Sequence, residues 1–154
     1  MRNKMGLTII VLLVLGLMGA CSTPEPTATP APEVEAGPAA LVIKGLVAQE
    51  QSLTMDDLKG YEVITITAEH SKKGQDEYEG VRLNVLLDEA GVQDGATTLA
   101  FVADDGYSVE MPLADVQGCA DCLVSFRTQG GLRTVMPGLP SNTWVKGVIS
   151  VEAK

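Results

Sequence analysis

The three cysteines are the side chains in this sequence best suited to redox, metal or covalent chemistry. Cys119 and Cys122 form a Cys-x-x-Cys pair in VQGCADCLVSF, residues 116–126, and Cys21 stands alone near the N-terminus. A Cys-x-x-Cys pair can be a redox dithiol, half of a metal site or a structural disulfide. The redox compartment and the surrounding fold decide among these, so both must be inferred from the rest of the chain.

The N-terminal segment indicates an exported protein. Arg2 and Lys4 precede the apolar run GLTIIVLLVLGLMGA, residues 6–20, which ends at Cys21. A basic start, a short apolar run and small residues before a cleavage site are typical of a secretory signal peptide, and the run is short for a membrane span. An uncleaved anchor is the alternative. The ending LMGAC resembles the bacterial lipoprotein signal, which implies that residues 1–20 are removed and Cys21 is lipidated.

A proline-rich segment separates Cys21 from the folded part. Residues 21–40 contain five of the eight prolines. Proline fixes φ and removes backbone donors, so this segment is predicted to be an extended tether. We expect one folded domain over residues 41–154, held by lipid on the outer face of the bacterial cytoplasmic membrane or in the cell envelope.

The charge of the chain disfavours nucleic acid as a partner. Loss of residues 1–20 removes Arg2 and Lys4, which leaves 9 basic against 20 acidic side chains, a net charge of −11. Phosphate backbones repel such a surface. The expected partners are the membrane, through the lipid anchor at Cys21, and an unidentified protein or small molecule.

Strand patterns outnumber helix patterns in residues 41–154. The β-branched segment YEVITITAEH predicts a strand that returns after SKKGQ, and Asp105-Gly106 predicts a second hairpin turn. Further strands are expected in LVIKG, CLVSF, LRTVM and WVKGVISVE. Helices are short: Thr54 begins a capping box, and LNVLLDEAG presents one apolar face. The predicted class is α+β, with mixed or antiparallel sheet and a few short helices.

The order of these pieces resembles the oxidoreductase molybdopterin-binding domain family, to which sulfite oxidase belongs. The similar pieces, in order, are KGLV, SLTMDDL, YEGVRLNVLLDEAGV, DDGYSVEMPL, GGLRTVMPG and WVKGVISVE. The resemblance implies a short form of the sulfite-oxidase-like fold over nearly all of residues 41–154. It also implies molybdopterin as a cofactor, with molybdenum held by a cysteine thiolate.

The resemblance places that thiolate at or near Ala68, by counting back from the family's Gly-Val pair, here Gly80-Val81. An alanine methyl cannot coordinate a metal, and no other cysteine lies between Cys21 and Cys119. We therefore expect no bound cofactor and no metal, and the sequence names no catalytic residue.

The resemblance also gives three candidates for holding a pterin. Arg133 matches the family's arginine, and Trp144 and Lys146 match its aromatic-basic piece near the end. Thr128 or Gln129 stands where the family often has a histidine. Structural roles remain open as well, as a surface or sheet-edge cation for Arg133 and a core aromatic for Trp144.

The cysteine pair can now be assigned. With His70, Cys119 and Cys122 supply only three of the four ligands that a zinc site needs, and His70 is expected to be an exposed hairpin residue. The pair leads into a strand and does not open the helix of a βαβ unit, as a thioredoxin-like dithiol would. Residues three apart in a helical turn lie within bridging distance, so we predict a structural Cys119–Cys122 disulfide.

Together these features predict a lipid-anchored envelope protein that serves as a binding or interaction module. The alternative is a molybdopterin-dependent oxidoreductase, or a component of one. A dithiol redox protein that uses Cys119 and Cys122 is the weaker alternative.

Overall fold

The structure is a computed structural model that describes residues 37–70 and 74–154. The predicted signal peptide, the predicted lipidation site Cys21 and most of the predicted tether lie outside these residues. Within the described ranges, no helix is both long enough and apolar enough to cross a membrane.

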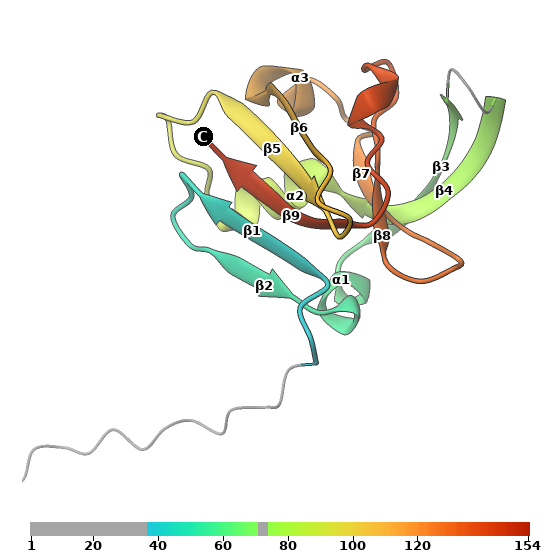
Figure 1. Ribbon diagram of the computed structural model, residues 1–154, viewed down its shortest axis with the longest axis horizontal. Helices are drawn as coiled ribbons and strands as arrows, with labels where there is room; N and C mark the ends of the chain where they lie inside the picture. Colours follow the sequence, from blue (N-terminus) through green and yellow to red (C-terminus); the bar gives the residue numbers. More distant parts are fainter. Residues whose placement is uncertain (1–36, 71–73) are drawn as a thin grey trace, which may run out of the picture. The chain divides into compact units, whose positions relative to one another are not determined.

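Five strands form the first sheet, in the order β2-β1-β9-β5-β6 (Figure 1). β1 and β9 run parallel, and the other neighbours are antiparallel, with a register shift between β5 and β9 at Val102/Ala103. The strands are β1 (Leu41–Gly45), β2 (Gln51–Leu53), β5 (Thr98–Ala103), β6 (Ser108–Pro112) and β9 (Val148–Ala153).

Four antiparallel strands form the second sheet, in the order β3-β4-β7-β8. They are β3 (Val63–His70), β4 (Gly74–Arg82), β7 (Leu123–Phe126) and β8 (Leu132–Val135). β3 and β4 pair along their whole length, whereas β4 pairs with β7 only over Gly80–Arg82. The far part of the β3–β4 hairpin therefore extends away from β7 and β8, as Figure 1 shows.

Short helices connect and bridge the sheets. They are α1 (Met55–Gly60), α2 (Leu83–Ala90), α3 (Leu113–Gln117) and the 3-10 helix η1 (Ser141–Thr143). The apolar face of α2 is fully used, because Leu83, Leu86, Leu87 and Ala90 are all buried. α2 contacts β1 of the first sheet and both β4 and β7 of the second, so one hydrophobic core serves both sheets.

The predicted α+β class, dominated by mixed and antiparallel sheet, is confirmed. The Thr54 capping box is present, with the Thr54 hydroxyl and the Asp57 carboxylate each accepting a backbone N–H. The Asp105-Gly106 turn joins β5 to β6. Two short elements were missed: β2, which pairs back on β1, and η1. Both are three residues long, too short for a periodic pattern to register.

Candidate functional site

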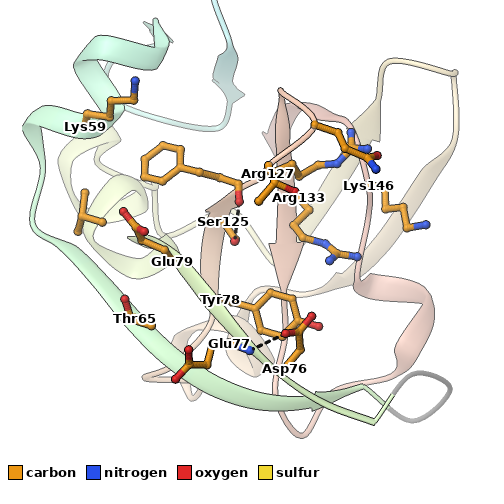
Figure 2. A pocket seen from close by; sticks show the side chains of 14 residues that line it. Lys59, Thr65, Asp76, Glu77, Tyr78, Glu79, Ser125, Arg127, Arg133 and Lys146 are labelled. Carbon is orange, nitrogen blue, oxygen red and sulfur yellow. Dashed lines mark hydrogen bonds between the residues drawn. The ribbon is translucent and has the colours of Figure 1, made fainter.

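A groove of about 1020 Å³ opens where β4 diverges from β7 and β8 (Figure 2). One wall is the stretch of β4 from Asp76 to Glu79, together with Val63 and Thr65 of β3 and Lys59 of α1. The other is formed by the end of β7, the β7–β8 loop, and the side chains of Arg133 and Lys146. The groove exists because the β4–β7 ladder stops at Gly80 while β4 continues along β3.

The second wall carries three cations, Arg127, Arg133 and Lys146. Arg133 and Lys146 come together through an isolated antiparallel bridge, although 13 positions separate them in the sequence. No ion pair within 4.0 Å involves any of the three among residues 37–70 and 74–154. Their charge is therefore available to a ligand.

Arg133 is held by an aromatic ring. Its guanidinium carbon lies 5.4 Å from the centroid of the Tyr78 ring, within the range of a cation–π contact, and Figure 2 shows the side chain pointing from β8 toward that ring. The Arg133 Nε is buried and has no hydrogen-bond partner within the described part of the chain. A buried donor without an acceptor costs stability, so this atom marks a place where an acceptor would bind favourably.

Behind Tyr78 lies a row of rings. The centroids of Tyr78 and Trp144 are 5.5 Å apart, and those of Trp144 and His70 are 4.9 Å apart, both in edge-to-face geometry. The Trp144 indole donates from Nε1 to the carbonyl oxygen of Met136 at 2.9 Å. Trp144 is only 7% exposed and does not line the groove, which fits the core role left open for it. His70 is half-buried against this ring, so the expectation that it is exposed was wrong.

The β4 wall is acidic. Asp76, Glu77 and Glu79 are exposed and line the groove, and the Asp76 carboxylate accepts the backbone N–H of Glu77 at 3.0 Å. The groove thus has an anionic wall and a cationic wall, and Tyr78 lies between them. This pattern suits a ligand that carries both signs of charge.

Ala68 lies outside the groove, in the body of β3. It pairs with Asp76, it is 4% exposed, and it borders a separate pocket of about 640 Å³ together with Pro137, Leu139 and Trp144. Over residues 37–70 and 74–154, no group of three or more His, Cys, Asp or Glu side chains is placed to hold a metal ion.

The structure contains the predicted Cys119–Cys122 disulfide, in the turn that joins α3 to β7. The two Cα atoms are 5.4 Å apart. Cys122 is fully buried, and the Cys119 Sγ lies 3.8 Å from the carbonyl oxygen of Pro137. The Asn84 side chain donates to the carbonyl oxygen of Cys119 at 3.3 Å, which ties the turn to α2. Neither cysteine lines the groove.

Shifted pKa values occur elsewhere in the domain. Hydrogen bonds to the Thr54 backbone N–H and hydroxyl lower the pKa of Asp57. Burial, with a hydrogen bond to Glu89, raises the pKa of Tyr61 to about 12. The Glu110 carboxylate, 2.8 Å from Lys154, raises the pKa of that amine. All three groups belong to caps or surface pairs outside the groove.

Of the three pterin-binding candidates that the resemblance gave, Arg133 and Lys146 line the groove and Trp144 does not, whereas the acidic wall and Tyr78 were not anticipated. Tyr78 sits in a strand pattern that reads equally well as core, and it is indeed only 5% exposed. The regular alternation of Glu77, Tyr78 and Glu79 was the available signal, because it puts charge and ring on opposite faces of one strand.

The chain belongs to the oxidoreductase molybdopterin-binding domain family, because that family's model matches residues 28–154. Among solved structures it is similar to the crystal structure of the sulfane dehydrogenase SoxCD from Paracoccus pantotrophus, with 26% sequence identity and a TM-score of 0.63. That match covers 73% of this chain but only 37% of the other, so this chain spans little more than a third of its length. A comparison with curated proteins finds no match.

Proposed function

We propose that this protein is an envelope lipoprotein, anchored through Cys21, in which the family's fold serves as a binding module. Its binding site is the groove between β4 and the β7–β8 loop. Molybdopterin is the cofactor of the family. In this proposal the chain does not bind that cofactor and instead binds a protein or small-molecule partner.

The observation that carries the proposal is the side chain at Ala68. The resemblance places the metal-binding thiolate there, and a methyl group in the middle of a strand offers no lone pair. The two described cysteines are bonded to each other, and Cys122 is fully buried, so neither sulfur is a free thiolate. The residues present therefore do not fit a molybdenum centre.

The groove supports the binding role. Cations without ion-pair partners stand opposite exposed carboxylates, and the Nε of Arg133 lacks an acceptor among the described residues. The groove lining contains no cysteine or histidine, and its buried hydroxyl-bearing residues are Tyr78 and Ser125. Ser125 donates to the carbonyl oxygen of Phe126 at 3.3 Å. This composition favours recognition over covalent chemistry.

Metal analysis tests the proposal. Protein purified from a host that makes molybdopterin should contain no molybdenum by elemental analysis and no pterin fluorescence after acid oxidation. An Ala68→Cys variant is the matched control: molybdenum in the variant alone would support the assignment of this position. Near-stoichiometric molybdenum in the wild type would overturn the binding-module proposal.

The anchor is tested separately. Wild-type protein should fractionate with membranes, and its intact mass should lack residues 1–20 and include the acyl chains. Cys21→Ser should retain the leader, because the lipoprotein signal peptidase acts at a lipidated cysteine. A wild-type mass that includes residues 1–20 without lipid would contradict the anchor.

A molybdopterin-dependent oxidoreductase is the second candidate. It is favoured by the placement of Arg133 and Lys146, which occupy family positions and share one wall of the groove. The same metal analysis decides between the two. A dithiol enzyme using Cys119 and Cys122 is disfavoured by the full burial of Cys122.

A further inference from the structure

One edge of β4 has no strand partner. Along one side β4 pairs with β3 from Gly74 to Val81, and along the other it pairs with β7 only from Gly80 to Arg82. Within the described ranges, the stretch Gly74–Glu79 thus has a ladder on one side only. Its open side faces the groove. Unpaired backbone groups along a strand edge are a template for another strand.

The backbone groups that face the groove can be identified. The N–H of Glu77 donates to the Asp76 carboxylate at 3.0 Å, drawn as a dashed line in Figure 2, so it does not take part in the β3 ladder. In an antiparallel pair, alternate residues direct N–H and C=O toward the partner strand, so Gln75 and Glu79 share the outward direction of Glu77. Five residues of strand extend about 16 Å, enough for several backbone hydrogen bonds.

The side chains beside this edge differ between the two faces of the strand. Glu77 and Glu79 lie on one face of the strand, and Asp76 and Tyr78 lie on the other. The register joins Gly80 to Ser125 and Ser125 to Arg133, so Arg133 is on the same face as Tyr78. A strand added at this edge would meet the Glu77 and Glu79 carboxylates on one face. On the other face it would meet Asp76, Tyr78 and the cationic wall.

We propose that the open edge of β4 binds an extended segment of a partner protein in which a basic, an acidic and a basic residue alternate. The acidic residue lies opposite Tyr78 and reaches Arg133 and Lys146, and the two basic residues lie opposite Glu77 and Glu79. This inference rests on the proposed function and specifies its partner class: main-chain hydrogen bonds supply the affinity, and alternate side chains supply the specificity.

Charge argues against two other occupants. A second copy of β4 would place Glu77 and Glu79 against their own kind, and like charges opposite each other destabilise a strand pair. The sequence of residues 22–40 is rich in proline, which lacks a backbone donor, and its charged residues are all acidic. A partner strand with alternating charge avoids both the like-charge repulsion and the loss of backbone donors.

The test uses the full chain, labelled with nitrogen-15, and two synthetic peptides. The first has Lys-Glu-Lys at its centre, flanked by Val and Thr, and the second has Glu-Lys-Glu in the same frame. The first peptide should shift the amide resonances of Gln75, Glu77 and Glu79 and protect them from hydrogen exchange. The charge-swapped peptide should bind roughly tenfold more weakly, because three cross-strand pairs become repulsive.

Two variants separate the contribution of backbone hydrogen bonds to peptide binding from the contribution of side-chain charge. Glu77→Pro removes the outward N–H and leaves the β3 ladder intact, so the protection should disappear. Glu77→Gln keeps that donor and should weaken binding only a few-fold by loss of one charge pair. If the proline variant does not fold, a second peptide makes the same test on the wild-type protein. It is the Lys-Glu-Lys peptide with N-methyl groups on the amides that face the protein, and it should not bind because those backbone donors are removed.

Several results would overturn the inference. They are equal binding of both peptides, full binding by a correctly folded Glu77→Pro variant, peptide shifts confined to the outer edge of β3, or concentration-dependent β4 protection without peptide. Metal analysis distinguishes a failure of this inference from a failure of the proposed function. Metal-free protein that ignores both peptides would refute the strand site alone, and molybdenum in the protein would refute the binding module itself.

Discussion

The two sheets of this domain differ in how completely their strands are paired. In the first sheet β5 pairs with β6 on one side and β9 on the other over almost its whole length, and Phe101 at its centre is fully buried. In the second sheet β4 continues for six residues beyond its last contact with β7. The residues there are glycine, glutamine, tyrosine and carboxylates, and only Tyr78 is buried.

The difference separates stability from recognition. A fully paired apolar strand has every backbone group bonded and its side chains packed, so it has little left to offer a ligand. The incomplete edge of β4 leaves donors, acceptors and charges next to a groove. We infer that the first sheet, α2 and the buried strands β7 and β8 supply most of the folding free energy, and that the outer β3–β4 hairpin is free to specialise.

The largest expected effect follows from removing a core side chain of the first sheet. Phe101→Ala should lower the free energy of unfolding by about 3–5 kcal/mol, because it deletes a fully buried ring from β5. Thr65→Ala, at an exposed position of β3, should change it by less than about 0.5 kcal/mol. Urea denaturation followed by circular dichroism measures both. Comparable losses in the two variants would erase the distinction between the packed core and the outer β3–β4 hairpin.

The junction where β4 meets β7 comes next. A Cβ on Gly80 would lie 2.6 Å from the Cα of Ser125 and would also collide with the backbone carbonyl of Val124. Because backbone atoms cannot rotate away, Gly80→Ala should cost about 1–3 kcal/mol. Gly60→Ala, where no atom lies within 4 Å of the new methyl, is the matched control and should be neutral or slightly stabilising. Equal thermal melting of the two variants would contradict this close approach of β4 and β7.

The sequence predicts the local features of this fold and does not predict its long-range pairings. The leucine spacing of α2, the Asp105-Gly106 turn and the Thr54 cap are local patterns, and each was predicted correctly. The end of the β4–β7 ladder depends on a register between residues more than 40 positions apart, which no local pattern encodes. The pairing of Arg133 with Lys146 within one wall of the groove also joins positions that no local pattern connects, and only the family resemblance singled them out.

The disulfide should have a smaller effect than the core side chain and an effect similar to that of the junction. It closes a loop of only four residues, for which the chain-entropy model gives about 2 kcal/mol. Reduction of the wild type should therefore lower the unfolding free energy by that amount and leave peptide binding at the β4 edge unchanged. A Cys119→Ala, Cys122→Ala double variant should match the reduced protein. Loss of groove binding on reduction would mean that the β7 turn and the groove are coupled.

The smallest effect concerns α1, the helix that connects β2 of the first sheet to β3 of the second. Thr54→Ala removes the hydroxyl that accepts the Asp57 N–H at 3.1 Å, which should cost about 1 kcal/mol.

The second hydrogen bond of this capping box runs from the Thr54 backbone N–H to the Asp57 carboxylate, and it makes the contribution of the cap to stability pH-dependent. Because Thr54 lowers the pKa of Asp57 in the folded protein, the cap stabilises fully above the unfolded pKa of about 3.9. Its contribution is lost as pH falls from that value through the lower folded pKa. Asp57→Asn should flatten this part of the acid unfolding curve, while Asp56→Asn removes the same charge and leaves the cap intact, so it should keep the slope. An identical acid dependence in both variants would show that the cap does not couple the junction between the sheets to pH.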